Sequence, residues 1–159
     1  MFFSLIDKID ELTPGKSVVA TKSLAMSEEY LRDHFPKFPV MPGVLMIEAM
    51  TQASSWLVRA TENFAHSMVV LKETRNVKFG QFLQPGQTLV VTSNIVSDTE
   101  NETVLKAQGS IEGQVRIRAQ LTLSKYNLAT LSPHQGAMDE KVIRELKEEL
   151  ALLWNEYQE

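Results

Sequence analysis

The sequence predicts an α+β fold in which a largely antiparallel sheet wraps around one long buried helix, with an amphipathic helix added at the C-terminus. Residues 43–63 predict the buried helix, because apolar side chains occupy nearly every side of its first half. Residues 138–157 carry one apolar stripe, which predicts the second helix. Four segments between the helices read as strands: 68–79, 88–97, 103–111 and 114–125.

The N-terminal part predicts two further strands, 2–12 and 17–25, joined by a turn at Pro14-Gly15. The last strand of the chain, 114–125, has the clearest pattern, because apolar and polar residues alternate along it as far as residue 124. One of its faces is apolar and is expected to point into the core: Val115, Ile117, Ala119, Leu121 and Leu123.

A loop connects the second strand to the long helix. Residues 27–30 predict a short capped helical turn in front of it. The loop begins at His34, and three prolines within seven residues are expected to keep it extended. The last of these, Pro42, stands where a helix start tolerates proline, so the helix should begin at Gly43.

The chain of 159 residues has the length of one domain, and 43% of its residues are hydrophobic, which suffices for a core. We expect a body at residues 1–126, a linker at 127–137 and a C-terminal helix at 138–159. Ser132-Pro133 and Gln135-Gly136 indicate the linker. The helix is expected to pack against the body or against a partner.

Charge and composition exclude several classes of function. The net charge is −4, and residues 137–159 hold seven acidic and three basic side chains, so the rest of the chain carries 13 of each sign. Such a neutral body predicts no nucleic-acid binding. No run approaches the roughly 20 apolar residues of a membrane span, and the N-terminus becomes charged too early for a signal peptide.

The chain contains no cysteine, which excludes disulfides, zinc-thiolate sites and cysteine nucleophiles and suits a cytoplasmic protein. His66 and His134 show no acidic or histidine partner at the spacing of metal ligands, so no metal site is expected. His34 and Glu48 instead predict acid/base chemistry. An imidazole is suited to proton transfer near neutral pH. A lone carboxylate in an apolar helix must be paired, protonated or functional.

The residues around this pair resemble the active-site signature of the FabZ-type (3R)-hydroxyacyl-[acyl carrier protein] dehydratases, which have the hotdog fold. The matching positions are His34, Phe35, Pro36, Pro39 to Leu45, Glu48, Ala49 and Gln52. The resemblance extends to about residue 126. It implies cofactor-free dehydration of a (3R)-3-hydroxyacyl thioester on acyl carrier protein to the trans-2-enoyl product, in fatty-acid or related lipid or polyketide synthesis.

The resemblance also implies a role for each site residue. His34 removes the α-proton, Glu48 protonates the departing 3-hydroxyl, and the N–H of Gly43 binds the thioester carbonyl. Gly43 and Val44 open the helix, where free N–H groups and the positive end of the dipole gather. The alternatives are a structural loop histidine, a structural hydrogen bond of Glu48 and a glycine required only by the turn.

Three more residues are candidates for substrate binding. Gln52, one turn past Glu48, either orients that carboxylate or caps a strand. Phe79 and Leu83 either line an acyl tunnel or pack in the core. The open sheet edge predicts a homodimer with a continuous sheet. The resemblance implies that a hexamer of three dimers is possible and that the site is shared between two subunits. Six cations are candidates for contact with acyl carrier protein: Arg32, Lys37, Arg59, Lys72, Arg75 and Lys78.

Asp33 and Lys37 depart from the family pattern, because they replace the glycines that usually flank His-Phe-Pro. Since glycine permits positive φ and close backbone approach, these residues are expected to reshape the loop or to crowd the acyl entrance. The departures keep two other functions open. One is a hotdog thioesterase, which would hydrolyse the thioester, and the other is a non-catalytic hotdog protein that binds an acyl carrier.

Overall fold

The computed structural model describes residues 3–157 of the chain and has a six-stranded sheet curved around helix α1 (Gly43–Thr61). The strands are β1 (Lys8–Thr13), β2 (Ser17–Ser23), β3 (Met68–Phe79), β4 (Thr88–Asp98), β5 (Glu102–Ile111) and β6 (Gln114–Tyr126). The remaining elements are the 3₁₀ turns η1 (Glu29–Arg32) and η2 (Pro133–Gln135) and the helices α2 (Leu128–Leu131) and α3 (Gly136–Leu153). The four later strands agree with the predicted ranges to within one residue.

All strand pairs described in the sheet are antiparallel, and the order is β1-β2-β4-β5-β6-β3. This order leaves β3 at one edge and β1 at the other. Helix α1 contacts every strand and fills the hollow of the sheet. The predicted alternation of β6 is confirmed, because Ile117, Ala119, Leu121 and Leu123 are all buried.

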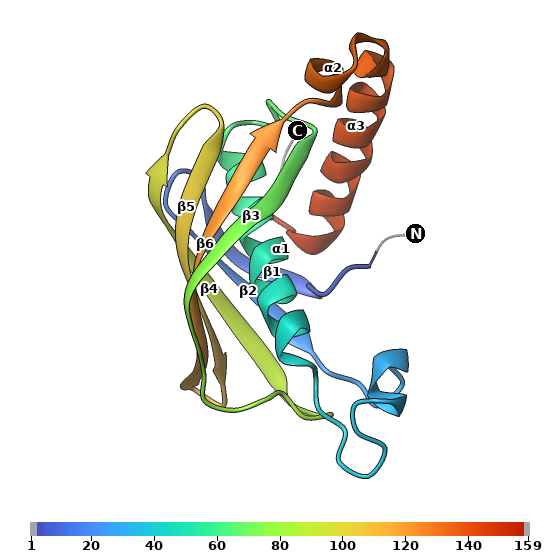
Figure 1. The fold of residues 1–159 in the computed structure, drawn as a ribbon, viewed down its shortest axis with the longest axis vertical. Coiled ribbons are helices and arrows are strands. Elements are labelled where there is room, and N and C mark those ends of the chain that lie inside the picture. The colour runs from blue at the N-terminus through green and yellow to red at the C-terminus, as the bar shows by residue number, and fades with distance from the viewer. Residues whose placement is uncertain (1–2, 158–159) are drawn as a thin grey trace.

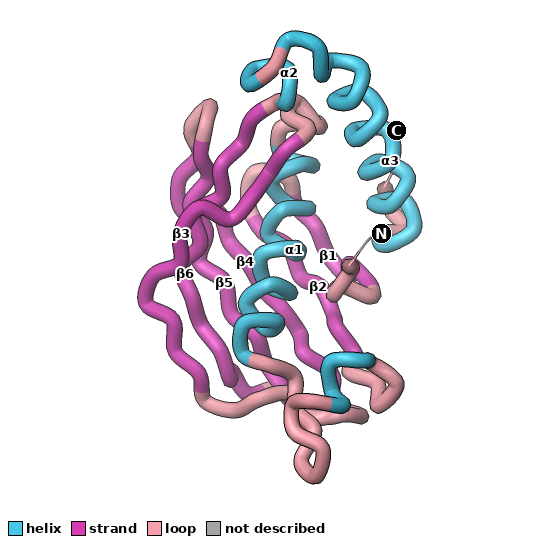
Figure 2. The backbone as a smooth tube through the Cα atoms, turned by 45° about the vertical axis from the view of Figure 1, so that its right-hand side comes forward, coloured by secondary structure: helices cyan, strands magenta, loops and turns pink. Residues whose placement is uncertain are grey.

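Helix α3 forms a third layer. Figures 1 and 2 both show it beside the C-terminal half of α1, on the side of α1 away from the sheet. Leu146 and Leu150 of its apolar stripe are buried in the same core cluster as Trp56 and Leu57 of α1. The acidic C-terminal helix is therefore packed against the body. Within residues 3–157, no helix combines the length and the apolar content needed to cross a bilayer.

The junction between β6 and α3 is more ordered than the linker expected at 127–137. It contains α2 and η2, and α3 starts at Gly136 and ends at Leu153, four residues before the predicted end. Asp139 explains the order, because its carboxylate accepts hydrogen bonds from the N–H of Leu128 at 2.8 Å and of Ala129 at 2.9 Å. Ser67 Oγ also donates to this carboxylate. One buried acid thus joins the start of α2 to α3 and to the segment before β3.

Two predictions on the N-terminal side are wrong. The first strand starts at Lys8, whereas the predicted start, residue 2, lies outside the described residues. The segment before Lys8 does not pair as a strand at Leu5, because the N–H of Leu5 donates to the side chain of Gln52 on α1. The helical turn covers Glu29–Arg32, and no side chain caps it. Glu28 stands at its N-cap, but its carboxylate is occupied by Lys22, at 2.7 Å, and by the Tyr30 hydroxyl.

Two predictions about the end of α1 are also wrong. The helix ends at Thr61 rather than at about residue 63, because Asn63 and Phe64 adopt positive φ values of 51° and 56°. His66 has an acidic partner, since its Nδ1 lies 3.0 Å from Oε2 of Glu62, one helical turn earlier in sequence. This pair is separate from His34 and Glu48.

Candidate active site

His34 is held by its own loop. Its Nδ1 lies 3.0 Å from the carbonyl oxygen of Val40, and the N–H of Val40 donates to the His34 carbonyl over 3.0 Å. A carbonyl oxygen only accepts, so the neutral imidazole must carry its proton on Nδ1. The other ring nitrogen, Nε2, is then left with a lone pair. The loop therefore fixes the tautomer in which Nε2 can take up a proton.

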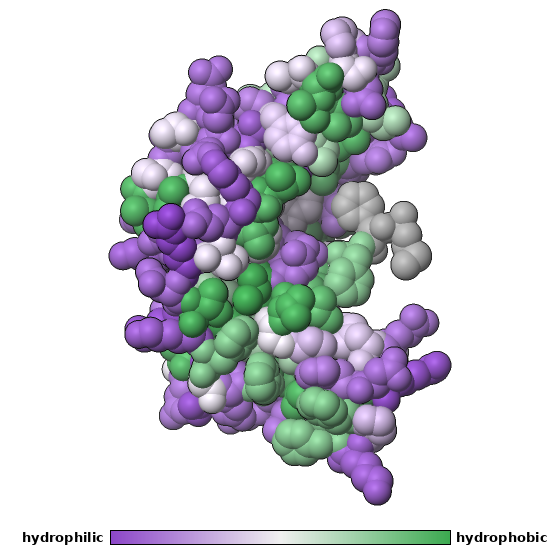
Figure 3. Space-filling view, in the orientation of Figure 1, coloured by the Kyte–Doolittle hydropathy of each residue, from purple (hydrophilic) through white to green (hydrophobic). Residues whose placement is uncertain are grey.

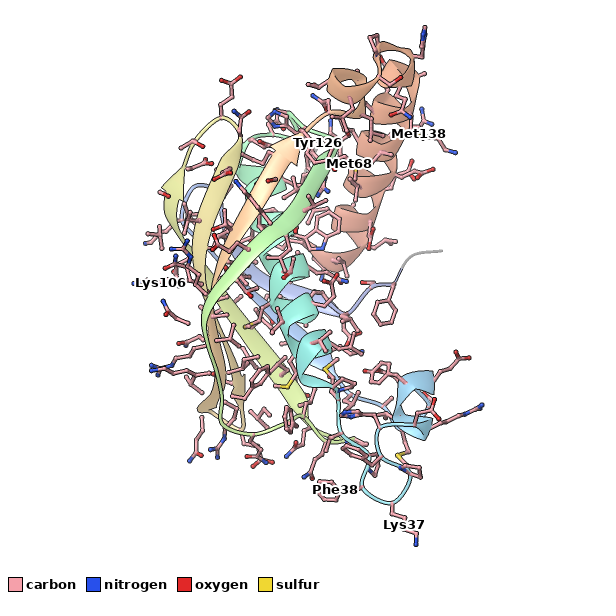
Figure 4. The ribbon with its side chains drawn as sticks, viewed as in Figure 1. Lys37, Phe38, Met68, Lys106, Tyr126 and Met138 are labelled. Carbon is pink, nitrogen blue, oxygen red and sulfur yellow. The ribbon has the colours of Figure 1, made fainter. Side chains whose placement is uncertain are left out.

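The loop that carries His34 doubles back and is not extended, in contrast to the prediction. Phe35 and Phe38 exchange backbone hydrogen bonds of 3.3 and 3.0 Å, which closes a tight turn with Lys37 at its tip. Neither Asp33, with φ of −101°, nor Lys37 has a positive φ. The residues that replace the family glycines therefore occupy ordinary backbone conformations. Figure 4 shows Lys37 pointing away from the body.

Glu48 is half-buried on α1 and has a defined partner. Gln52, one turn later, donates from Nε2 to Oε1 of Glu48 over 3.0 Å. The same amide donates to the carbonyl of Phe3 over 2.9 Å, and its oxygen accepts the N–H of Leu5 over 2.7 Å. Gln52 thus orients the carboxylate and binds the segment that precedes β1. It does not cap a strand, because β1 begins only at Lys8.

A cavity of about 360 Å³ opens beside Glu48, between α1, β3 and α3. Its wall combines apolar side chains of all three elements with a polar stripe of α1 at helical spacing, Glu48, Gln52, Ser55 and Arg59. A volume of this size lies in the range of small-molecule sites. His34 does not line this cavity, and no hydrogen bond joins it to Glu48 within residues 3–157.

The start of α1 is closely packed by aromatic rings. A Cβ atom on Gly43 would lie 2.9 Å from Cε1 of Phe79 and 3.1 Å from Cε1 of Phe82. Any larger residue at this position would have to displace one or both rings, which are partly exposed. The N–H groups of Gly43 and Val44 have no acceptor one turn earlier in the helix, as at every helix start. Leu83 lies fully buried in the core, whereas Phe79 is 44% exposed.

The first half of α1 is not covered on every side in the single chain, in contrast to the prediction. Val44 is 70% exposed, and Leu71 of β3 and the rings of Phe79 and Phe82 are exposed as well. In the space-filling view, hydrophobic side chains form a band over the region of β3 and α1 (Figure 3). An apolar surface beside a free sheet edge is typical of a face that another subunit covers.

Comparison with known proteins places this architecture in a family. The model of the FabA-like domain matches residues 1–120. The 3-hydroxyacyl-[acyl-carrier-protein] dehydratase FabZ of Lactobacillus helveticus (strain DPC 4571) is 38% identical over 117 residues, which cover 74% of this chain and 79% of that protein. The protein of the same name from Ehrlichia chaffeensis (strain ATCC CRL-10679 / Arkansas) is 35% identical over 128 residues, 80% of this chain and 88% of that protein.

The chain belongs to the FabZ-type dehydratase family. Solved structures confirm the hotdog fold of this family member. The dehydratase heterocomplex ApeI:P from Xenorhabdus doucetiae has a TM-score of 0.66 at 19% identity, over 84% of this chain and 90% of that chain. The structure of smu.793 from Streptococcus mutans UA159 bound to acetyl CoA has a TM-score of 0.59 at 16% identity, over 79% and 94%.

The family match ends before α2 and α3, yet α3 lines the cavity beside Glu48. Sequence reasoning did not assign Phe82, Glu149 or the backbone of Phe3 and Leu5 to this region. Phe82 could have been found, because it follows Phe79 by three residues just after a strand. The polar stripe from Glu48 to Arg59 was also readable, since its members recur every three or four residues in an apolar helix.

Two charged side chains, Arg59 and Glu149, line this cavity at a distance from Glu48 and interact electrostatically. Arg59 is 8% exposed, and burial lowers its pKa to about 10. The negative charges of Glu62 and Glu149 raise this pKa, but burial has the larger effect. Burial raises the pKa of the Glu149 carboxyl, and the nearby Arg59 partly offsets this effect. Among the described residues, no three His, Asp or Glu side chains lie together as metal ligands would.

Proposed function

We propose that this protein dehydrates a (3R)-3-hydroxyacyl group on acyl carrier protein to the trans-2-enoyl product, in fatty-acid or related lipid or polyketide synthesis. The family membership and the names of its relatives support the reaction. The observation that carries the proposal is the state of the two titratable side chains. The Val40 carbonyl holds the neutral His34 ring in the tautomer with its lone pair on Nε2, and Glu48, bonded by Gln52, lines a cavity.

In the proposed reaction, Nε2 of His34 takes the α-proton of the thioester. The electrons of that C–H bond form the Cα=Cβ double bond, and the C–O bond to the 3-hydroxyl breaks. Glu48 supplies a proton to the leaving hydroxyl, so the second product is water. A proton then passes from the imidazolium back to the carboxylate by way of solvent. The N–H of Gly43 donates to the thioester carbonyl and stabilises the enolate-like charge.

We infer that the site is completed by a second copy of the chain. The loop holds His34 apart from the cavity of its own subunit, and β3 is a sheet edge beside exposed Val44, Leu71, Phe79 and Phe82. Pairing of two β3 strands about a two-fold axis would continue the sheet and cover this apolar band. Each His34 would then face the Glu48 cavity of its partner.

The proposal is tested by incubating the purified protein separately with (3R)-3-hydroxybutyryl and trans-2-butenoyl thioesters of acyl carrier protein, with mass analysis of the acyl groups. The expected result is interconversion of the two thioesters by loss or gain of water. Release of free acid would show a thioesterase instead. Stoichiometric binding without conversion would show a non-catalytic acyl-carrier-binding protein.

A further inference from the structure

The cavity beside Glu48 changes its chemistry along its length. It follows α1 from Glu48 to Arg59, a span of 11 residues and thus roughly 16 Å of helix rise. The walls in between include Trp56, Val69 and Leu146. An acyl chain that starts at Glu48 would run past these apolar side chains and end at Arg59. Its terminal group would therefore meet a charged side chain.

Arg59 is the most buried charged side chain of this wall. It is more than nine-tenths buried, and within residues 3–157 its guanidinium makes one hydrogen bond, from Nη1 to the carbonyl of Ser67 over 3.1 Å. A guanidinium carries several N–H donors, and burying donors without acceptors is costly. Arg59 is not among the described residues with a side-chain nitrogen that is both shut off from solvent and unpaired, so its remaining donors keep contact with solvent, and Arg59 lines the cavity.

Glu149 of α3 lines the same end of the cavity. Its carboxylate takes part in no hydrogen bond or ion pair with the residues described, although the positive charge of Arg59 attracts it electrostatically. The cavity end thus offers free donors on one side and free acceptors on the other. A hydroxyl group both accepts and donates, so it can satisfy the two together. A terminal methyl would give neither side chain a hydrogen-bond partner, and a terminal carboxylate would attract Arg59 but repel the like charge of Glu149.

The geometry points to an acyl chain that ends in a neutral hydrogen-bonding group, such as an ω-hydroxyl, as the substrate class of this site, with Arg59 and Glu149 as its recognition residues. This inference rests on the proposed dehydration, because the acyl group must be anchored at Glu48 for its end to reach Arg59. Helix α3 supplies one of the two recognition residues and lies outside the matched family domain. The specificity therefore depends on α3 as well as on Arg59 of α1.

The test uses pairs of 3-hydroxyacyl thioesters of equal chain length that end either in a methyl group or in an ω-hydroxyl. The ratio of kcat/KM within each pair is measured over a series of lengths. Short pairs should show no preference, because they do not reach Arg59. Once the chain spans the cavity, the ω-hydroxyl substrate should be preferred by about tenfold, the effect of one hydrogen bond to a charged group. A preference for the methyl end, or none at any length, would overturn the inference.

Two variants on the same helix localise the effect. Glu149→Leu should reduce the preference for the ω-hydroxyl substrate towards unity, whereas Glu148→Leu, at the exposed neighbouring position, should leave it unchanged. Turnover of 3-hydroxybutyryl thioester, which is too short to reach Arg59, should be the same in Glu148→Leu and the wild type. An unchanged preference in Glu149→Leu would remove Glu149 from the site. Arg59→Met should lose the preference as well, with its folding checked by thermal unfolding.

Binding separates this inference from the proposed reaction. The affinities of saturated acyl thioesters with methyl and ω-hydroxyl ends are measured by calorimetry with the wild type and with Glu149→Leu. Tighter binding of the ω-hydroxyl end by the wild type alone would support the inference even if no thioester were dehydrated. Dehydration of both ends at equal rates with equal affinities would leave the proposed function intact and refute the polar cavity end.

Discussion

The amide of Gln52 donates a hydrogen bond of 3.0 Å to Oε1 of Glu48 from one turn further along α1. Among the described residues, Oε2 of Glu48 accepts no hydrogen bond, so this oxygen remains available to a substrate in the proposed reaction. Gln52 also binds the backbone at Phe3 and Leu5, so the orientation of the carboxylate depends on the segment before β1. The proposed acid is therefore positioned by two parts of the chain that lie far apart in sequence.

Gln52→Leu should lower kcat by about tenfold with little change in KM, because Glu48 loses its orienting donor and keeps its position. It should also lower the Tm, since the N–H of Leu5 loses its acceptor. Steady-state kinetics and thermal unfolding measure the two effects. Gln114→Leu, at an exposed glutamine of β6, serves as control and should change neither. A variant with a normal kcat would show that the contact is structural only.

Glu48→Gln should reduce dehydration by at least about 100-fold while the fold remains, because the amide keeps the shape and cannot supply the proton. Glu29→Gln, which changes an exposed carboxylate on η1, should retain full activity. Circular dichroism would confirm that both variants are folded. Turnover near that of the wild type in Glu48→Gln would remove this residue from the mechanism.

Gly43→Ala should lower activity by about tenfold, since the added Cβ would come within 2.9 Å of the Phe79 ring and displace the helix start that carries the proposed oxyanion donor. The chain should still fold, because both contacting rings are partly exposed side chains that can move. Adding Phe79→Leu should restore part of the rate by making room. Equal activity in Gly43→Ala and the wild type would show that the position of this N–H is not critical.

His34→Ala and Glu48→Gln chains, unfolded together and allowed to reassemble, test the shared site. With unbiased two-fold pairing, half of the dimers contain both variants, and each of these has one wild-type site and one site with both defects. Activity should return to about a quarter of the wild-type value. Native mass spectrometry would verify the mixed dimers. If mixed dimers formed without recovering activity, each site would be built from a single chain.

Asp139→Asn should destabilise the protein at neutral pH by a few degrees in Tm. Burial raises the pKa of this carboxyl, but hydrogen bonds from Ser67, Ala129 and Leu128 more than offset burial, so the pKa lies below its ordinary value of about 3.9. A lowered folded-state pKa gives stability that is fully present above the ordinary value and is lost as pH falls through the folded value. The difference in Tm between wild type and variant should therefore begin to shrink as pH falls below about 4 and should vanish below the folded-state pKa. A constant difference down to pH 2 would show that ionisation of Asp139 does not matter.

The parts of this structure that the sequence predicts well are those that local patterns determine. Alternation defines β6, and Pro42 marks the start of α1, because both depend on neighbouring residues only. The folded-back His34 loop was missed, since reciprocal hydrogen bonds between Phe35 and Phe38 leave no periodic signal. Prolines restrict φ but do not determine where a chain turns.

Site contacts between distant segments could not be predicted for a different reason. Gln52 bonds to Leu5 across 47 positions of sequence. Arg59 interacts electrostatically with Glu149 only because the apolar stripe of α3 packs on α1. Amphipathic periodicity shows that a helix buries one face, and it does not say against what. The family resemblance gave no help with α3, because the matched domain ends at residue 120.

The attachment of the N-terminal segment to Gln52 affects how the protein should be produced for study. Phe3 and Leu5 are bound to the residue that orients Glu48, so an affinity tag fused at Met1 would be attached two residues from this contact. A slow rate measured on such a fusion would then report the tag rather than the enzyme. Removing the tag by a protease that leaves no extra residues, before any kinetic comparison, avoids this error.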